Sequence, residues 1–130
     1  MPVRYTPPTP DQLLPVPGVA LGTVAAKIKK WQRDDLLLAA FASGTVAAGV
    51  FTQNRFAAAP VAVCRRHLAE SGTIRALVVN AGNANAGTGA AGIAAAQATC
   101  TAVASKLRSA ATSAEPPSGC CCPTRRPSIA

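Results

Sequence analysis

The chain has 130 residues, of which 49% are hydrophobic, and its 13 lysines and arginines outweigh five acidic residues to give a net charge of +8. This length suffices for one domain with a modest core. No apolar run reaches the roughly 18 residues that a membrane-spanning helix needs, and the N-terminus lacks the apolar stretch of a secretory signal. These features exclude an integral membrane protein and predict a cytoplasmic one.

The basic residues lie in small, scattered groups with few aromatic residues among them. A stacking platform for single-stranded nucleic acid is therefore not expected. The charge would fit a polyanion partner, or a longer protein whose acidic residues lie elsewhere.

The five cysteines form two populations. Cys64 and Cys100 stand among apolar or small residues and are expected to be buried thiols. The other three, Cys120–Cys122, are adjacent and lack the spacing that lets thiolates converge on zinc. Since His67 is the only histidine, no metal site is predicted.

The N-terminal half is expected to begin with an extended, proline-rich arm over residues 1–18. A strand is predicted over residues 19–29, and a second apolar run follows over residues 36–43. Ser43-Gly44 resembles a tight hairpin turn leading into a further strand, residues 44–52.

The C-terminal half is expected to hold a strand and a short helix within residues 59–70, then a buried strand over residues 73–79. Residues 90–108 suit a helix because alanine is the best helix former. Strands mixed with helices in this order indicate an α/β fold, with the domain covering residues 19–108. The composition changes near Ala110, and residues 109–130, which lack periodicity, predict a disordered tail.

The most distinctive segment is the loop Asn80–Gly92, which holds three asparagines and four glycines in thirteen residues. Glycine and asparagine tolerate positive φ, and asparagine both donates and accepts hydrogen bonds. The asparagines are the candidate site residues, because they could line a substrate pocket or hold the backbone of the loop. They are Asn80, Asn83 and Asn85.

Within this loop, Gly87–Gly92 matches the G-x-G-x-x-G pattern of dinucleotide-binding proteins. The loop is too long for the tight first turn of that unit, and no acid stands about twenty residues further on to bind a ribose. The alternative is that these glycines serve helix packing alone.

Several segments resemble the N-terminal part of the ornithine acetyltransferase, or ArgJ, family of bifunctional glutamate N-acetyltransferases. They are Gly18-Val-Ala, Asp35-Leu-Leu-Leu, Gly49-Val-Phe-Thr-Gln-Asn-Arg-Phe-Ala-Ala-Ala-Pro60 and Arg75-Ala-Leu-Val-Val-Asn-Ala-Gly-Asn-Ala-Asn-Ala-Gly-Thr-Gly89. The resemblance runs from about residue 15 to residue 108 and implies the layered sheet-and-helix N-terminal portion of the ArgJ/DmpA-like fold.

The resemblance also implies a cytoplasmic enzyme of arginine biosynthesis that moves an acetyl group from N-acetylornithine to glutamate. Some members also use acetyl-CoA as a substrate, and none of this requires a bound cofactor. Members cleave themselves before a threonine that becomes the nucleophile, activated by its own amino group. Their two halves assemble into a heterotetramer, and an L-P-x-S-T-G-V segment supplies the oxyanion hole.

No catalytic residue of the family can be assigned in this chain. The L-P-x-S-T-G-V segment should follow soon after residue 110, and it is missing. Thr88 is a tempting substitute for the nucleophile, but it lies inside the asparagine-glycine loop and does not match the motif. The chain is therefore predicted to be an inactive fragment of the enzyme. Arg55 could pair with Asp34 or Asp35, or lie near an acidic substrate.

The genetic code offers a reason for the missing segment. If each codon of the tail starts at the third base of the preceding codon, Cys120–Cys122 yields Leu-Leu, and the codons that follow permit Pro-x-Ser-Thr. The next position cannot become the expected glycine. These readings suggest a frameshift near residue 110, in the gene or in its recorded sequence.

Two other functions remain open from the sequence. The loop could bind a small anion or an amino acid in a non-catalytic α/β module. The basic charge could instead mark a nucleic-acid-associated protein, whose binding would weaken steeply with salt.

Overall fold

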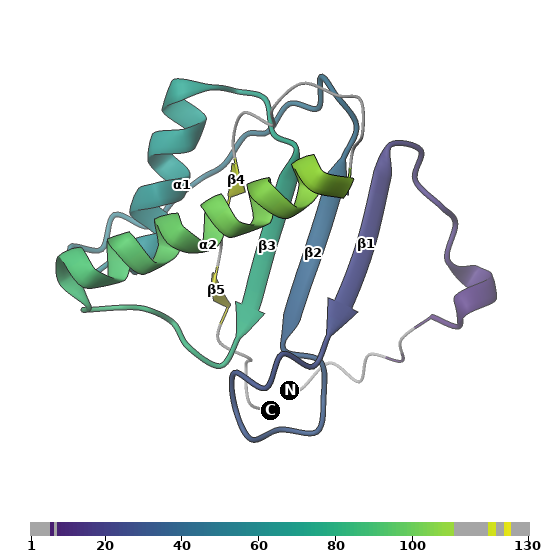
Figure 1. Cartoon of the computed structure of the whole chain (residues 1–130), viewed down its shortest axis with the longest axis horizontal. Coiled ribbons are helices and arrows are strands. Elements are labelled where there is room, and N and C mark those ends of the chain that lie inside the picture. The colour runs from purple at the N-terminus through teal and green to yellow at the C-terminus, as the bar shows by residue number, and fades with distance from the viewer. Residues whose placement is uncertain (1–5, 7, 111–119, 122–123, 126–130) are drawn as a thin grey trace.

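The computed structural model describes residues 6, 8–110, 120–121 and 124–125. A sheet is packed against two helices, in the chain order strand, strand, helix, strand, helix and two very short strands (Figure 1). The elements are a 3-10 turn at Pro10–Gln12, β1 (Val19–Val24), β2 (Leu36–Phe41), α1 (Ala59–Glu70), β3 (Ala76–Ala81), α2 (Gly89–Ala110), β4 (Cys120–Cys121) and β5 (Thr124–Arg125). The predicted α/β class is confirmed.

The sheet has the order β1-β2-β3, and its three main strands are antiparallel. Val19 pairs with Phe41 at one end of β1 and Val24 pairs with Leu36 at the other. Leu38 at the middle of β2 faces Val78 of β3. On its outer side β3 pairs in parallel with β4 and β5. The unbroken apolar run of β2 is explained by its central place, between two strands and with apolar contacts on both faces.

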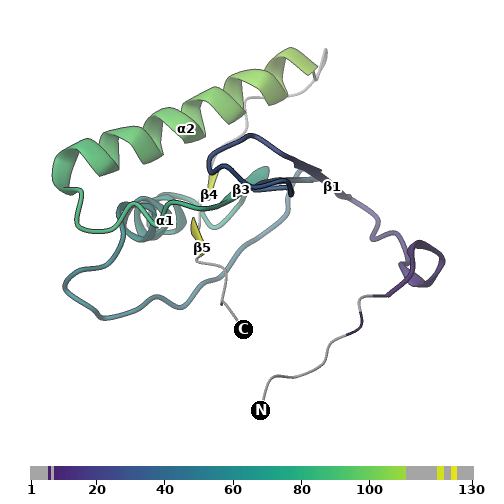
Figure 2. The same ribbon diagram turned by 90° about the horizontal axis from the view of Figure 1, so that it is seen from below.

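The helix α2 crosses one face of the sheet, whereas α1 lies beyond the β3 side (Figures 1 and 2). One core cluster joins Val63 of α1, Val78 of β3, and Ala96 and Cys100 of α2. The other joins Cys64 of α1 to Ile74, with contributions from both β2 and β3. Adjacent residues of α1 thus enter different clusters, and α1 ties the two faces together at one side of the sheet. Cys64 and Cys100 are buried and form no disulfide, as predicted.

The predicted strand over residues 44–52 is wrong. Gly44 does make a turn, with φ of +82°, but only Val46 of this segment forms a β-bridge, to Thr73. Both edges of β2 are already occupied, by β1 and β3, so β2 offers this segment no free edge. The hairpin instead joins β1 to β2 through the lysine-rich residues between them.

The predicted strand at the start of residues 59–70 is also wrong, because the whole segment is helical. Its β-branched valines suggested a strand, but Pro60 stands in the first turn, where its fixed φ favours a helix and its missing N–H costs nothing. An Arg66–Glu70 ion pair at 3.6 Å lies on the exposed side of the same helix. Ser71 caps α1 by donating its N–H to the carbonyl of His67, so the helix ends where the predicted segment 59–70 does.

The helix α2 extends two residues past its predicted end. The segment for which the sequence predicts a disordered tail lies largely outside the described residues. Within it, β4 and β5 are described as two-residue strands beside β3.

Candidate functional site

The asparagine-glycine loop connects the end of β3 to the start of α2 and has an unusual backbone. Gly82, Gly87 and Gly89 have φ of +127°, +70° and +59°, and Asn85 has φ of +48°. Glycine adopts positive φ without steric cost, and asparagine is among the few other residues that tolerate it. The composition of the loop is therefore explained by its backbone conformation.

Asn85 is the centre of the hydrogen bonds within this loop. Its backbone N–H donates to Oδ1 of Asn83 at 3.1 Å, and its own Nδ2 donates to the carbonyl of Gly92 at 2.8 Å. The Thr88 hydroxyl lies 2.6 Å from Oδ1 of Asn85 and 3.2 Å from its carbonyl oxygen. Asn83 and Asn85 thus order the loop, and Thr88 donates inward instead of standing clear as a nucleophile.

The third glycine of the G-x-G-x-x-G pattern packs against the same network. A Cβ on Gly92 would overlap the Thr88 hydroxyl and would lie 2.5 Å from Oδ1 of Asn85. Glycine is needed there so that the first turn of α2 can receive the loop side chains. This contact accounts for the glycine without a dinucleotide.

Asn80 differs from the other two asparagines. It lies in β3 opposite Leu36, on the face that α2 covers. Its Oδ1 atom is buried and has no hydrogen-bond partner among the described residues, and the same holds for Nε of Arg75 at the other end of the strand. A buried polar atom without a partner costs about 1–3 kcal/mol, so β3 holds unmet hydrogen-bonding capacity at both ends.

The segment Gly49–Pro60, which also carries the family resemblance, contacts this loop. The backbone N–H of Ala59 donates to the carbonyl of Asn85 at 3.0 Å. Just before it, Asn54 makes a turn by accepting from the N–H of Phe56 at 2.9 Å. The guanidinium of Arg65, in α1, donates a hydrogen bond to the carbonyl of Thr52 at 2.6 Å and so holds this turn against the helix. Two segments whose joined residues, Ala59 and Asn85, are 26 positions apart therefore contact each other.

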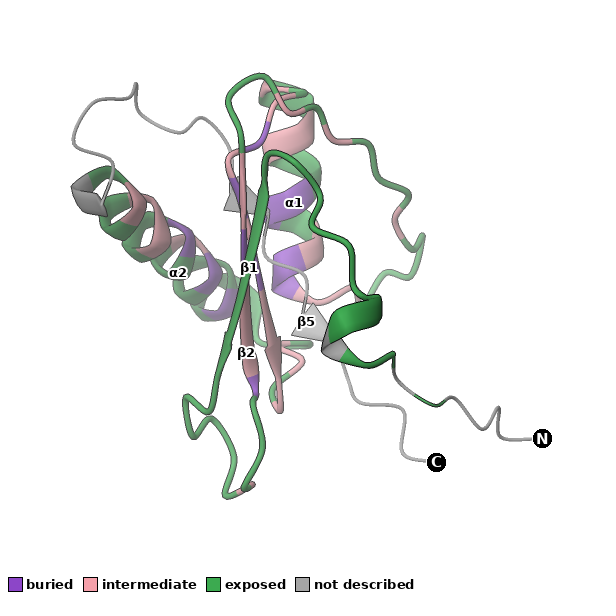
Figure 3. Ribbon diagram, turned by 90° about the vertical axis from the view of Figure 1, so that its right-hand side faces the viewer, coloured by how far each residue is buried: buried purple, intermediate pink, exposed green. Residues whose placement is uncertain are grey.

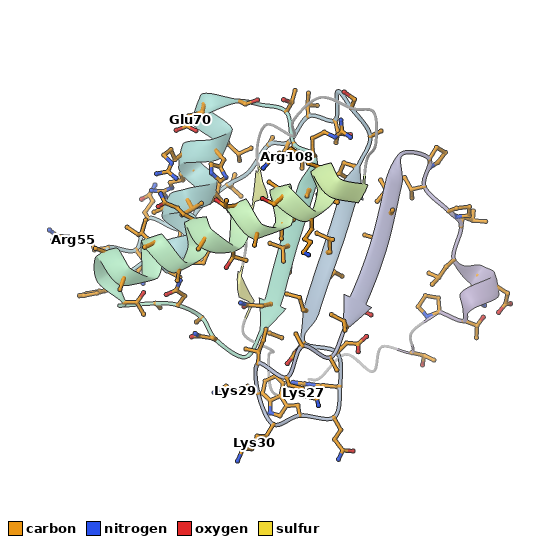
Figure 4. The ribbon with its side chains drawn as sticks, viewed as in Figure 1. Lys27, Lys29, Lys30, Arg55, Glu70 and Arg108 are labelled. Carbon is orange, nitrogen blue, oxygen red and sulfur yellow. The ribbon has the colours of Figure 1, made fainter. Side chains whose placement is uncertain are left out.

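The hairpin loop between β1 and β2, residues 25–35, lies at the end of the sheet where β3 leads into the asparagine-glycine loop (Figure 4). The carboxylate of Asp35, which is 3% exposed, accepts hydrogen bonds from the N–H groups of Ala26 and Ile28, both at 2.7 Å. Lys29 lies against Gly82, where an added Cβ would come within 2.8 Å of its Cγ. The basic hairpin is thus fixed beside the asparagine-glycine loop.

Arg55 does not pair with the aspartates that follow β1. The Asp34 carboxylate accepts from the Thr23 hydroxyl, and that of Asp35 is used by the hairpin backbone. Figure 4 shows Arg55 at the left edge of the molecule, away from the hairpin lysines at the bottom. That part of the sequence interpretation is wrong.

Within the described part of the chain, no three side chains of the metal-binding types converge on one point. In the same part, none of the helices is both long and apolar enough to cross a membrane.

The sequence of the chain matches that of a known protein family. A sequence model of the ArgJ family matches residues 20–119, which is more than half of the chain. The chain belongs to the ArgJ family. The match includes both motifs that meet at Asn85.

Related proteins agree with this assignment. The arginine biosynthesis bifunctional protein ArgJ of Methylococcus capsulatus is 56% identical over 93 residues, which cover 72% of this chain and 22% of that protein. The crystal structure of an ornithine acetyltransferase from Mycobacterium tuberculosis, complexed with ornithine, has a TM-score of 0.77 and 36% identity, over 88% of this chain and 58% of that chain. ArgJ of Bacillus halodurans gives a TM-score of 0.73 and 26% identity, over 83% and 53%.

The ArgJ-like fold predicted from the sequence is therefore confirmed, and the chain spans about a fifth of the length of the Methylococcus protein. Whether Asn80, Asn83 and Asn85 contact a substrate stays a prediction. The hydrogen bond from Ala59 to Asn85 was not foreseen. The only signal of this contact in the sequence is that the two distinctive segments, Gly49–Pro60 and Asn80–Gly92, occur in the same short chain.

Proposed function

We propose that this chain is the N-terminal part of a cytoplasmic arginine-biosynthesis acetyltransferase that moves acetyl from N-acetylornithine to glutamate. The observation that carries the proposal is the joining of the two family motifs at Asn85, in a chain 56% identical to an ArgJ protein over 93 residues. Some intact members of the family also use acetyl-CoA as an acetyl donor, and their two cleaved halves assemble into a heterotetramer.

The asparagine-glycine loop would then form one wall of the substrate pocket. Asn83 and Asn85 hold its shape, and Oδ1 of Asn80 is the polar atom left without a partner in the described chain. A preorganised loop of this kind positions substrate without losing energy to reorganisation. Its contribution is binding and orientation, because Thr88 is already engaged with Asn85.

The chain is proposed to be inactive alone. The segment L-P-x-S-T-G-V, which would supply the oxyanion hole, does not occur in it, and no threonine matches the nucleophile motif. Removal of a single oxyanion donor costs about 10²–10³ in rate, so loss of the whole segment together with the nucleophile would abolish acetyl transfer.

A frameshift is proposed to account for this loss. The composition of the chain changes near Ala110. The shifted reading that resembles the missing segment begins with Cys120. The proposed shift therefore lies near residue 110, upstream of that reading.

The test is a chimera in which residues 1–108 are followed by the remainder of the Methylococcus ArgJ protein. Ornithine release from N-acetylornithine and glutamate is measured for the chimera, the unmodified chain and the downstream portion alone. Activity only in the chimera supports the proposal. An inactive but folded chimera, together with ornithine binding by the unmodified chain, would favour the non-catalytic binding module. Salt-sensitive DNA retention by that chain would instead favour the nucleic-acid reading.

A further inference from the structure

Asn80 of β3 has a side-chain oxygen that nothing in the described chain satisfies. Its Oδ1 atom is buried and accepts no hydrogen bond from the described residues. Asn80 and Val78 stand two positions apart in β3, so their side chains lie on the same face of the sheet. Val78 packs there against Ala96 and Cys100 of α2, and Figure 3 shows the buried part of α2 turned toward this face. Buried acceptors in complete folds are normally satisfied by a donor.

The outer edge of β3 brings another part of the chain beside Asn80. β5 runs parallel to β3 along this edge (Figure 1), and Thr124 is the pairing partner of Asn80. β4 runs in the same direction, with Cys120 opposite Ala76. In both pairings the partner stands 44 positions further along the chain, so β4 and β5 share one register against β3.

The shifted reading of the tail places a hydroxyl group in this register. That reading permits Leu-Leu-Pro-x-Ser-Thr from position 120 onward, so its serine takes position 124 and its threonine takes position 125. The pairing sets position 124 beside Asn80 and position 125 beside Ala81. Partners on neighbouring strands lie about 4.8 Å apart, and their side chains share a face of the sheet. A serine at position 124 therefore brings its hydroxyl within reach of Oδ1 of Asn80.

We propose that Asn80 is a positioning residue of the intact enzyme, whose Oδ1 atom accepts a hydrogen bond from the serine hydroxyl of the L-P-x-S-T-G-V segment. This inference rests on the function proposed above. The threonine and glycine that follow the serine belong to the proposed oxyanion hole, where a displacement of about 1 Å can cost about 10²-fold in rate. Asn80 acts through the strand that carries these groups and does not touch the reacting atoms.

The same arrangement explains why asparagine occupies this position of β3. Asparagine is depleted in strands, and within the described chain its buried oxygen is only a cost to stability. The proposal gives that oxygen a use in the intact enzyme. Asn80 should therefore destabilise the chain by itself and assist catalysis in the complete protein.

Asn80→Leu in the unmodified chain tests the first of these effects. Leucine has a similar size and removes the unpartnered oxygen, so we expect Tm to rise by a few degrees. The matched control Asn83→Leu removes an oxygen that accepts from the N–H of Asn85, and it should not raise Tm. An unchanged or lowered Tm for Asn80→Leu would overturn the proposal.

The ArgJ chimera tests the second effect. Asn80→Leu should lower its kcat about tenfold or more and leave the KM for N-acetylornithine nearly unchanged. Changing the serine of L-P-x-S-T-G-V to alanine should cause a similar loss. The double variant should be no worse than either single variant, because both changes remove the same hydrogen bond. Multiplied losses, an unaffected kcat, or a raised KM with kcat unchanged would each overturn the proposal.

A disulfide tests the register in the unmodified chain. In a background with Cys120–Cys122 changed to serine, Asn80→Cys combined with Thr124→Cys should cross-link on mild oxidation, since about 4.8 Å lies within the Cα separation of disulfides. Val78→Cys combined with Thr124→Cys should not, because an offset of two residues separates the Cα atoms by roughly 8 Å. Equal cross-linking by the two pairs would overturn the register.

The chimera without further substitutions separates failure of this inference from failure of the proposed function. If that chimera is inactive, the proposed function is contradicted and the inference falls with it. If it is active and indifferent to Asn80→Leu, only the positioning role is rejected.

Discussion

The two sides of the sheet are built in different ways. On the β3 side, residues are buried or half-buried beneath two helices, and Val63 is 1% exposed. On the β1 side every strand residue is exposed. There the hairpin is fixed by a buried carboxylate instead of by side-chain packing. Stability on one side thus depends on apolar burial, and on the other it depends on the hydrogen bonds of Asp35.

The asparagine-glycine loop and the exposed strand β1 belong to these two different sides of the sheet. The asparagine-glycine loop leads from the packed side, where β3 and α2 hold its ends, and its own hydrogen bonds fix its shape. The open side carries the exposed residues of β1. Substitutions on the two sides should therefore differ in how far they lower the free energy of unfolding. They should also differ in which backbone amides become open to hydrogen exchange.

The largest effect is expected from Asp35→Ala. Two hydrogen bonds to a charged group are lost, each contributing about 1.5–3 kcal/mol, so the free energy of unfolding should fall by about 3 kcal/mol or more. Urea denaturation measures the change, and hydrogen exchange should rise first at β1. Asp34→Ala removes an exposed carboxylate and should cost less than about 1 kcal/mol. Equal costs for the two aspartates would contradict this account of the hairpin.

Val63→Ala tests the packed side. Two methyl groups are removed from a fully buried position, which should lower the free energy of unfolding by about 2 kcal/mol. The matched control Val50→Ala alters a valine on the surface and should change it by less than about 0.5 kcal/mol. Comparable losses would mean that this core does not carry the stability of the domain.

Asn85→Ala should lower the free energy of unfolding by about 1.5 kcal/mol, because it removes side-chain hydrogen bonds and places alanine at positive φ. Asn85→Gly removes the same hydrogen bonds without the backbone penalty, so it should cost about 1 kcal/mol less than alanine does. Thermal melts of both variants give the difference. If glycine proves as costly as alanine, backbone conformation is not what selects asparagine here.

The smallest effect is expected from Asn83→Ala, which removes one exposed hydrogen bond to the N–H of Asn85. Its cost should be about 0.5 kcal/mol. In the ArgJ chimera, the same substitution distinguishes the two roles proposed for this residue. A rise in KM well beyond that of a neutral surface variant would indicate substrate contact, whereas an unchanged KM would limit Asn83 to holding the loop.

The sequence predicted the elements whose pattern is determined locally. The apolar run of β2 and the alanine-rich α2 were found because length and composition distinguish a strand from a helix. Residues 44–52 have an equally strand-like pattern, but they can form a strand only where a neighbouring strand has a free edge to pair with. Residues 59–64 combine β-branched residues with a proline. They form a helix because that conformation buries Val63 in one core cluster and Cys64 in the other.

The site was predicted only in part for the same reason. Positive φ in the loop could be inferred from asparagine and glycine, whereas the hydrogen bond from Ala59 to Asn85 depends on the packing of distant segments. The role of Asp35 was also missed, since one aspartate beside another gives no signal of which is buried.

We propose that this chain derives from an ArgJ enzyme whose reading frame shifts near residue 110. Determining the DNA sequence across that region tests it most directly. The claim predicts that a shifted frame reads Leu-Leu-Pro-x-Ser-Thr from Cys120 onward and continues into ArgJ-like sequence. An intact frame, with no such continuation in either alternative frame, would contradict it.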